Sequence, residues 1–599
     1  MSDEQRNTIW RFAIIFIVIT LGFVAVLVKI AYIQTVERDE WLKVAEKQVP
    51  TVRPITATRG NILDCNGRLL ASSMPQYYMY MDTRVPALHE KKGALFTAHI
   101  DSLAKDLANI VGEYSQAEYK ARIVQAYRKG EKRLKVCDHR INYLQRQELE
   151  QNALIKKGKY RSGIFFEDQH RRIKPYGLLA SRTIGGIYGE GGGGNSGLEK
   201  RFDKELRGED GLSSIQKIGG RYESVTIDEA KDGLDVVTTI DANLQDIVEN
   251  ALLERTTLRG AKWGCCILME TQTGYIRAIA NLDRSATDGH YFEAQNHAVQ
   301  RVEPGSTFKT IALMAALDDG KIDIDDTVSV TRQPWKYFTV KHTDAHPMDT
   351  LLTVRSALAV SSNIALAKLI TRSYEGSANK FVRKIEKMGL MDSVYCEIPG
   401  ADKVRIDVPK DTVTLSKMAY GYSVELSPMQ ILMFYNAIAN GGRMMRPMLV
   451  TAIQQNGEIE KRFRPEVVKS SICGSRTLKD IQGALHDVVW DNHLGTAAKK
   501  AWIGNKAQSN LVSIAGKTGT AQLIIPGHGY SGRHHRMTFV GYFPEENPRY
   551  TCICMIEDPQ YPYDAGLDCG TTVRVIAEKT MAYTGCYVYR NGERVLDKR

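Results

Sequence analysis

The chain has 599 residues, 43% of them hydrophobic, and a formal net charge of +11 at pH 7. This length is too great for one hydrophobic core and predicts three or four structural units. The composition is that of an ordinary globular protein rather than a disordered or collagen-like chain. The positive charge is spread along the sequence without a nucleic-acid-binding motif, so it indicates a solvated surface or attraction to an anionic envelope or membrane.

The N-terminal segment predicts a membrane anchor. Residues 1–11 are short and polar, and residues 12–33 are apolar apart from Lys29. This is about the 20 residues that a bilayer span requires. A cleaved signal peptide is the alternative, but no small-residue cleavage site directly follows the apolar run. Basic residues lie on both sides of the segment, so the flanking charges do not orient it.

Residues 34–235 contain no catalytic constellation. The stretch 59–71 predicts two short strands around an Asn-Gly-type turn, and a charged helical region is expected from about 96 to 157. The glycine-rich run 185–197 predicts a loop. A phosphate-binding loop is the alternative, but no Gly-Lys-Ser/Thr follows it. Residues 197–208 resume helical periodicity and end at a glycine.

From residue 236 onwards the pattern changes to that of an α/β (α+β) domain. Residues 236–240 predict a strand, and Asp241 is placed to cap the helix that follows. Further strands are expected at 265–270, 275–280, 511–523, 537–543 and 550–556, and a final helix at about 572–584. Two strand groups around a helical middle predict a mainly antiparallel sheet with helices on both faces.

The cysteines and histidines do not indicate a metal site. None of the ten cysteines shows a zinc spacing, and those at 265–266 and at 552 and 554 lie in apolar runs typical of strand cores. His528, His534 and His535 fall in an expected loop, where surface histidines are the simpler interpretation. We therefore expect neither a metal nor a cofactor.

The stretch 303–309, Glu-Pro-Gly-Ser-Thr-Phe-Lys, predicts a nucleophile at the start of a buried helix. The Pro-Gly turn precedes the apolar run 310–317, which places Ser306 at the mouth of the helix and Lys309 on the same face. A desolvated lysine can remove the proton of the serine, and a helix N-terminus favours an oxyanion. The same spacing recurs at 102/105, 214/217 and 377/380, so other motifs must confirm the site.

Two further motifs supply that confirmation. Ser361-Ser362-Asn363 interrupts an apolar helical region, although a capping turn is an alternative interpretation. Lys517-Thr518-Gly519-Thr520 occurs once, and its cation and hydroxyls can bind a carboxylate while the glycine allows close backbone approach. The candidate catalytic residues are Ser306, Lys309, Ser361, Asn363 and Lys517, and the candidate substrate-binding residues are Thr518, Gly519 and Thr520.

The order Ser-x-x-Lys, Ser-x-Asn, Lys-Thr-Gly is the signature of penicillin-recognising serine enzymes. The chain resembles the monofunctional (class B) penicillin-binding proteins, which are D,D-transpeptidases. The resemblance covers nearly the whole chain, including the stretches 59–71, 197–208, 239–245 and 539–544. It implies a cytoplasmic tail at 1–11, a transmembrane anchor at 12–33, an elongated pedestal domain for dimerisation or interaction at 34–235 and a penicillin-recognising transpeptidase domain at 236–599.

The resemblance implies peptidoglycan cross-linking through an acyl-enzyme. Ser306 attacks the D-Ala–D-Ala peptide of a stem, D-alanine leaves, and an amine from a neighbouring stem resolves the acyl group. Lys309 is then the base, kept neutral by burial and by the cation Lys517. Ser361 relays the proton to the leaving group, and Asn363 holds the substrate amide and Lys309.

The same resemblance implies the substrate-binding roles. Thr518 and Thr520 receive the terminal carboxylate of the substrate, and the backbone N–H groups of Ser306 and Thr520 form the oxyanion hole. β-Lactams imitate the peptide and acylate the same serine.

Within the family, Glu303 and residues 426–430 are more similar to the cell-division type than to the elongation type, which is the alternative. Two further alternatives are a membrane-anchored β-lactam sensor, which also pairs Ser-x-x-Lys with Lys-Thr-Gly, and an inactive scaffold of a division complex. The short segment before the anchor argues against a sensor, which needs a signalling module inside the cell.

The resemblance also implies location and partners. The chain is expected in the inner (cytoplasmic) membrane as a single-pass protein with its catalytic domain on the periplasmic, extracytoplasmic side. Its expected partners are peptidoglycan stem peptides, β-lactams, the lipid bilayer, a membrane glycosyltransferase of the shape, division and sporulation type, and other divisome proteins. No nucleic acid is expected.

Overall fold

The computed structural model describes residues 3–41, 51–189, 191–218, 221–390, 396–401, 404–406, 411–498, 506–525, 527 and 529–585. The chain forms two compact units, one made of residues 1–57 and 209–232 and the other of residues 58–208 and 233–599. His528 lies outside the described residues.

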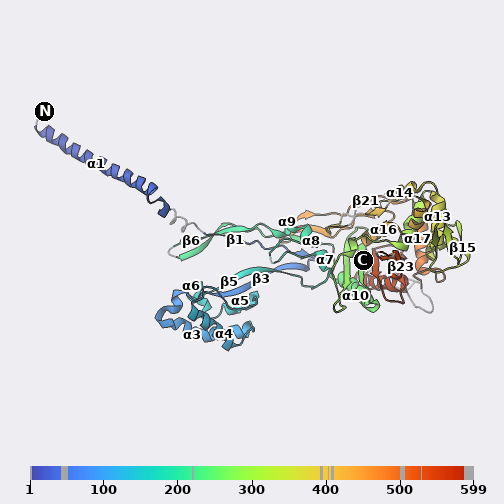
Figure 1. The fold of residues 1–599 in the computed structure, drawn as a ribbon, viewed down its shortest axis with the longest axis horizontal. Helices are drawn as coiled ribbons and strands as arrows, with labels where there is room; N and C mark the ends of the chain where they lie inside the picture. The colour runs from blue at the N-terminus through green and yellow to red at the C-terminus, as the bar shows by residue number, and fades with distance from the viewer. Residues whose placement is uncertain are drawn as a thin grey trace. The chain divides into compact units, whose positions relative to one another are not determined.

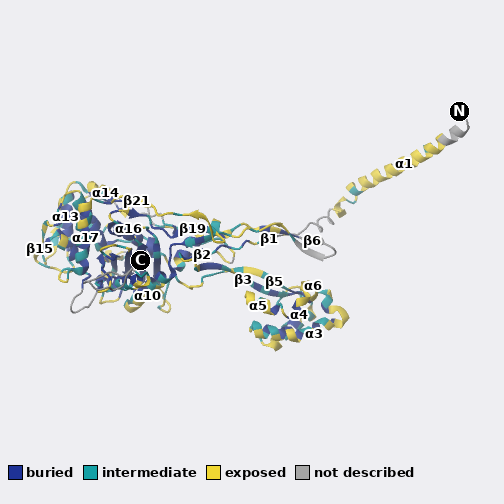
Figure 2. Ribbon diagram, turned by 180° about the vertical axis from the view of Figure 1, so that it is seen from behind, coloured by how far each residue is buried: buried dark blue, intermediate teal, exposed yellow. Residues whose placement is uncertain are grey.

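The first unit contains the predicted apolar helix, α1 (Asp3–Thr35). The most apolar 18-residue window of its segment Ile9–Thr35 has a mean hydropathy of 2.8, and the segment is long and apolar enough to cross a membrane. No part of that segment is buried within the protein, and Figure 2 shows α1 exposed along its described side chains. The unit also contains an antiparallel sheet in the order β1 (Thr51–Ile55), β6 (Gly211–Ile218) and β7 (Arg221–Asp228).

The second unit is built around a six-stranded antiparallel sheet, as the strand pattern predicted (Figure 1). The strands in spatial order are β11 (Tyr291–Phe292), β10 (Ile276–Arg284), β9 (Trp263–Glu270), β24 (Tyr550–Glu557), β23 (Gly529–Phe543) and β22 (Ala515–Ile525). β22 is therefore an edge strand. It begins at Ala515 rather than at residue 511, and His534 and His535 lie within β23 rather than in the expected loop.

Helices cover both faces of this sheet, because alternate residues of the central strands point to opposite sides. On β9, Cys265 and Ile267 belong to one core and Cys266 and Leu268 to the other. The first core is completed by α11 (Phe308–Asp318), α13 (Asn363–Tyr374) and α16 (Pro428–Ala439), and the second by α10 (Ala242–Arg259) and α18 (Thr571–Tyr583). The burial colours of Figure 2 place α16 in the interior.

The predicted cap of the first helix of this region is confirmed. Asp241 caps α10 by accepting hydrogen bonds from the backbone N–H groups of Asn243 and Leu244.

The remaining helices of this region are α12 (Val354–Ala359), α14 (Ala378–Lys387), α15 (Thr412–Met418) and α17 (Ser475–Trp490). Its short strands are β12 (Thr327–Val330), β13 (Trp335–Tyr337), β14 (Val340–His342), β15 (Thr350–Thr353), β16 (Arg405–Ile406), β17 (Val424–Glu425), β18 (Met444–Met445) and β21 (Val467–Lys469).

A second sheet joins N-terminal and C-terminal parts of the chain. Its order is β20 (Glu458–Arg462), β19 (Val450–Gln455), β8 (Asp235–Thr238), β2 (Ile62–Leu63), β3 (Leu69–Met81) and β4 (Leu134–Lys135), and β5 (Ile164–Ile173) also pairs with β3. The predicted hairpin at 59–71 is β2 with the start of β3, turning at Gly67, whose φ is 82°. The charged helical region expected from about residue 96 begins earlier, with α3 (Pro86–Ile110), and continues through α4 (Gln116–Lys129) and α5 (Tyr143–Leu149).

A buried ion-pair network holds the two N-terminal motifs together. The predicted helical stretch after the glycine-rich loop is α8 (Gly197–Arg201) and α9 (Asp203–Arg207). Glu199 on α8 is fully buried and accepts from Arg59 Nε at 2.8 Å and from Arg172 Nε at 2.6 Å. Asp203 accepts from Arg59 Nη1 at 2.8 Å. One carboxylate therefore neutralises two guanidinium groups that come from distant parts of the chain.

We predict that Glu199→Gln destabilises the second unit by about 3–5 kcal/mol, because breaking a buried pair leaves uncompensated charge. The measurement is chemical denaturation of the full-length protein in detergent. Glu167→Gln is the matched control, since it breaks the exposed pair of Glu167 with Arg133. Equal losses for the two variants would contradict the assigned role of the network.

Candidate active site

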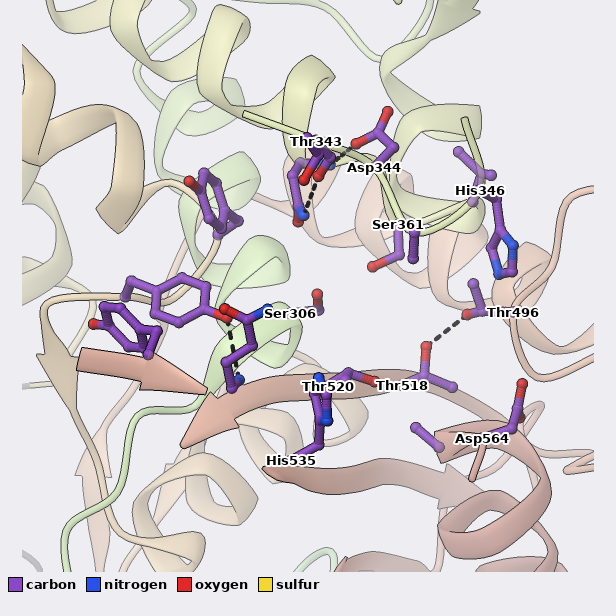
Figure 3. Close-up of a pocket in the computed structure, with 18 of the residues that line it drawn as sticks. Ser306, Thr343, Asp344, His346, Ser361, Thr496, Thr518, Thr520, His535 and Asp564 are labelled. Carbon is purple, nitrogen blue, oxygen red and sulfur yellow. Dashed lines mark hydrogen bonds between the residues drawn. The ribbon is translucent and has the colours of Figure 1, made fainter. Parts of the chain in front are cut away.

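The three sequence motifs meet at one cavity of about 450 Å³ (Figure 3). Ser306, Ser361 and Asn363 line it from the helical region, and Thr518 and Thr520 line it from edge strand β22. The figure shows Ser306 and Ser361 across the cavity from the two threonines. The predicted grouping of these residues is thus present in the fold.

The turn that carries Ser306 is fixed from both sides. Ser306 lies in the 3₁₀ turn η3 (Gly305–Thr307), directly before α11, as predicted. Gly305 has a φ of 55°, which favours glycine. The buried Tyr435 of α16 donates its hydroxyl to Thr307 O at 2.8 Å. The serine is therefore held on a rigid support rather than on a free loop.

Two buried lysines share one serine hydroxyl. Lys309 Nζ lies 3.1 Å from Ser361 Oγ and also donates to the Ser361 carbonyl at 2.5 Å. Lys517 Nζ lies 2.9 Å from the same Oγ and donates to Thr518 O at 3.0 Å. Both lysine side chains are fully buried. Ser361 thus connects the lysine of the first motif to the lysine of the third.

The connection that carries Ser361 is strained and anchored. The predicted helix break is present, since α12 ends at Ala359 and α13 begins at Asn363. Ser361 itself has a φ of 59°, an unfavourable conformation for a residue with a Cβ. Asp344 holds the start of α13 by accepting from Ser362 Oγ at 2.7 Å and from the Asn363 N–H at 2.5 Å.

The electrostatics of the lysine pair differ from the expectation. Burial lowers the pKa of Lys309 to about 7, against a smaller opposing effect of Asp344. Burial also lowers the pKa of Lys517 well below its usual value, and the nearby Lys309 lowers it further. We expected Lys517 to be the cation that keeps Lys309 neutral. In the free cavity Lys309 has the nearby carboxylate, so a shared positive charge is favoured on Lys309.

Strand β22 supplies the opposite wall. Thr518 Oγ1 lies 2.6 Å from Thr496 Oγ1, and Thr520 is exposed to the cavity. A Cβ at Gly519 would lie 2.9 Å from Thr307 Cγ2, so only glycine lets the strand pack this closely against the turn that carries Ser306. This explains the glycine of the third motif.

One predicted contact is missing from the free site. Asn363 Nδ2 donates to Thr343 O at 2.8 Å, and within the described part of the chain it makes no hydrogen bond to Lys309. Ser306 Oγ likewise has no hydrogen-bond partner among the described residues. Both residues line the cavity.

Several cavity residues were not found from the sequence. Asp344, Thr496 and Asp564 line the site, and so do Tyr420 and Tyr422. Each lies outside the three motifs and reaches the cavity only through the tertiary fold. For Asp344 the sequence carried no usable signal, because its contacts to α13 join residues 18 to 20 positions apart.

The histidines that line or flank this region make ordinary polar contacts. His534 lies 2.8 Å from Asp558 Oδ1, and His535 lies 2.8 Å from the Tyr563 hydroxyl. Over the ranges that the structure describes, no cluster of three or more His, Cys, Asp or Glu residues could hold a metal ion.

A serine at the start of a buried helix, three residues before a low-pKa lysine and in the same cavity as a hydroxyl-bearing edge strand, is the arrangement of a serine acyltransferase. The family model "Penicillin binding protein transpeptidase domain" matches residues 264–578, and "Penicillin-binding Protein dimerisation domain" matches residues 54–238. The first match covers more than half of the chain. The chain therefore belongs to the penicillin-binding protein transpeptidases, and the resemblance found in the sequence is confirmed.

Named relatives agree with this assignment. The chain is 26% identical to "Peptidoglycan D,D-transpeptidase FtsI" of Escherichia coli K12, over 93% of this chain and 89% of that protein. It is 24% identical to "Probable peptidoglycan D,D-transpeptidase PenA" of Neisseria meningitidis, over 94% and 91%. The fold matches the crystal structure of Penicillin Binding Protein 2X from Streptococcus thermophilus with a TM-score of 0.75 at 21% identity, over 89% of this chain and 80% of that one.

We predict that the rate of acylation of the free enzyme rises with pH through about 7, as Lys309 loses its proton and becomes a base. Asp344→Asn should move the midpoint of this profile to lower pH, because the carboxylate of Asp344 stabilises the protonated lysine. Stopped-flow acylation by a fluorescent penicillin, followed from about two pH units below to about two above the Lys309 pKa of about 7, measures both profiles. An unchanged midpoint in Asp344→Asn would contradict this electrostatic account.

Proposed function

We propose that this chain is a peptidoglycan D,D-transpeptidase whose acyl-enzyme forms on Ser306. Ser306 Oγ attacks the carbonyl carbon of the D-Ala–D-Ala bond, and its proton passes to neutral Lys309. The C–N bond then breaks, and D-alanine leaves with a proton relayed through Ser361. An amine of a neighbouring stem peptide attacks the ester carbonyl, which releases Ser306 and forms the cross-link.

The observation that carries this proposal is the sharing of Ser361 Oγ by Lys309 and Lys517 in the cavity that Ser306 also lines. A substrate carboxylate at Thr518 and Thr520 would stabilise the protonated form of the adjacent Lys517. Repulsion from that cation would then lower the pKa of Lys309 further. Substrate binding would thereby move the shared charge onto Lys517 and leave Lys309 as the base.

The strand and the helix turn provide the remaining groups. We assign the backbone N–H groups of Ser306 and Thr520 to the oxyanion hole, where one donor contributes about 3–4 kcal/mol to the barrier reduction. The side chain of Asn363, whose Nδ2 donates to Thr343 O, lines the cavity and would hold the backbone amide of the bound peptide. Thr518, Gly519 and Thr520 together form the substrate-binding edge, with the glycine permitting the close approach of the strand to the serine.

We further propose that the enzyme works in septal cell-wall synthesis. Support comes from Glu303 and residues 426–430, and from the relatives named FtsI and PenA. The α1 helix would anchor residues 34–235 as a pedestal and residues 236–599 as the catalytic domain on the periplasmic side of the inner membrane, where stem peptides are cross-linked. A membrane glycosyltransferase and other division proteins would be its partners.

Ser306→Ala should abolish covalent labelling by fluorescent penicillin and release of D-alanine from a stem pentapeptide, because Ser306 is the serine of the Ser-x-x-Lys motif that lines the cavity. The variant should retain the wild-type denaturation midpoint, since Ser306 Oγ bonds to none of the described residues. Ser377→Ala is the control, as it removes the serine of another Ser-x-x-Lys copy. Wild-type labelling of Ser306→Ala would refute the assignment of the nucleophile.

A further inference from the structure

A buried lysine outside the three motifs lies behind the Thr518 end of the cavity. Lys506 is only 2% exposed. Its Nζ donates to Thr496 O at 3.1 Å and to Asp564 Oδ2 at 2.9 Å. Its own carbonyl accepts from Arg574 Nε of α18 at 3.1 Å. Lys506 thus joins the segment before β22 to two other segments that border the cavity.

Both partners of this lysine line the active-site cavity. Thr496 and Asp564 are cavity residues, and Figure 3 shows Thr496 directed at Thr518. The two hydroxyl oxygens lie 2.6 Å apart. Thr518 can therefore accept from Thr496 and donate its own proton into the cavity. Thr496 orients the hydroxyl to which a substrate carboxylate is assigned.

Asp564 presents an electrostatic difficulty for an anionic substrate. One of its oxygens accepts from the Leu567 N–H at 2.8 Å, and its side chain is 35% exposed. A carboxylate on the cavity wall repels the carboxylate of a bound peptide. Lys506 is its ion-pair partner and is itself almost fully buried. The pair keeps this wall close to neutral.

The segments around the pair are packed too closely to rearrange freely. A Cβ added at Gly566 would lie 2.6 Å from Thr496 O and 2.9 Å from Lys506 Cδ. The loop that carries Asp564 is therefore held directly against both groups. Loss of the lysine would leave the Asp564 carboxylate in place beside the cavity.

We propose that Lys506 and Thr496 are positioning residues of the carboxylate-binding end of the site, and that Lys506 also neutralises Asp564 so that an anionic substrate can bind. Thr496 orients the Thr518 hydroxyl, and the Lys506 amine holds Thr496 in place by donating to the Thr496 carbonyl. This inference rests on the proposed function, because it requires that the substrate carboxylate binds at Thr518.

The test compares a penicillin that has a free carboxylate with its methyl ester. The second-order acylation rate constant is measured for each probe with the full-length protein in detergent, and the acid-to-ester ratio is the readout. Lys506→Met should lower this ratio about 10-fold, because Asp564 becomes an unpaired anion. Thr496→Val should also lower the acid-to-ester ratio about 10-fold. The variant removes the hydroxyl that orients Thr518 for its hydrogen bond to the substrate carboxylate.

The double variant Lys506→Met/Asp564→Asn should recover the wild-type ratio within about threefold, because the repelling charge is gone. Should Lys506→Met fold poorly, Asp564→Asn alone tests the same idea, and it should raise the ratio by leaving Lys506 uncompensated. Lys384→Met is the matched control, since it breaks the ion pairs of another largely buried lysine, with Asp318 and Asp319, away from the cavity. Its ratio should stay at the wild-type value.

A purely structural role for Lys506 would lower both rate constants equally and leave the ratio unchanged, and that result would overturn the proposal. Failure of the double variant to recover the ratio would overturn the charge-compensation argument. Failure of the proposed function looks different, because the wild-type protein would then be acylated at Ser306 by neither probe.

Discussion

The structure depends above all on one constraint: two buried lysine amines share a single serine hydroxyl as a hydrogen-bond partner. Lys309 and Lys517 both reach Ser361 Oγ within 3.1 Å, and both are removed from solvent. A buried ammonium is costly unless it is paired or loses its proton. The site therefore cannot hold two full charges. Neutral Lys309 becomes available at a pH where an exposed lysine would be protonated.

Such a pair is useful only if its supports are rigid, and the fold provides that rigidity from distant parts of the sequence. Lys309 lies on a helix packed inside one core, Lys517 lies on the edge of the central sheet, and Ser361 lies on the break between two helices. Tyr435 and Asp344 fix the turns that carry the reacting groups. Catalytic groups held by packed elements and hydrogen bonds keep their geometry without a ligand.

Much of this could be predicted from sequence periodicity and motif order. The apolar strands, the Asp241 cap and the helix break at Ser361 are local features, and each is present. What could not be predicted depends on contacts between remote residues. The Asp344 carboxylate, which favours charge on Lys309 rather than on Lys517, is one example. The start of β22 at Ala515 is another example. The apolar residues Val512 and Ile514 before it are buried in the second core but do not belong to the strand.

The most direct test of the account is single-turnover acylation by a β-lactam for Lys309→Arg and Lys517→Arg across pH. Arginine cannot be deprotonated at working pH, so Lys309→Arg should lose acylation by about 10²–10⁴-fold or more. Lys517→Arg keeps a cation beside the carboxylate and should retain measurable acylation, with weaker binding as its main defect. If Lys309→Arg proves the more active variant, the assignment of the base is wrong.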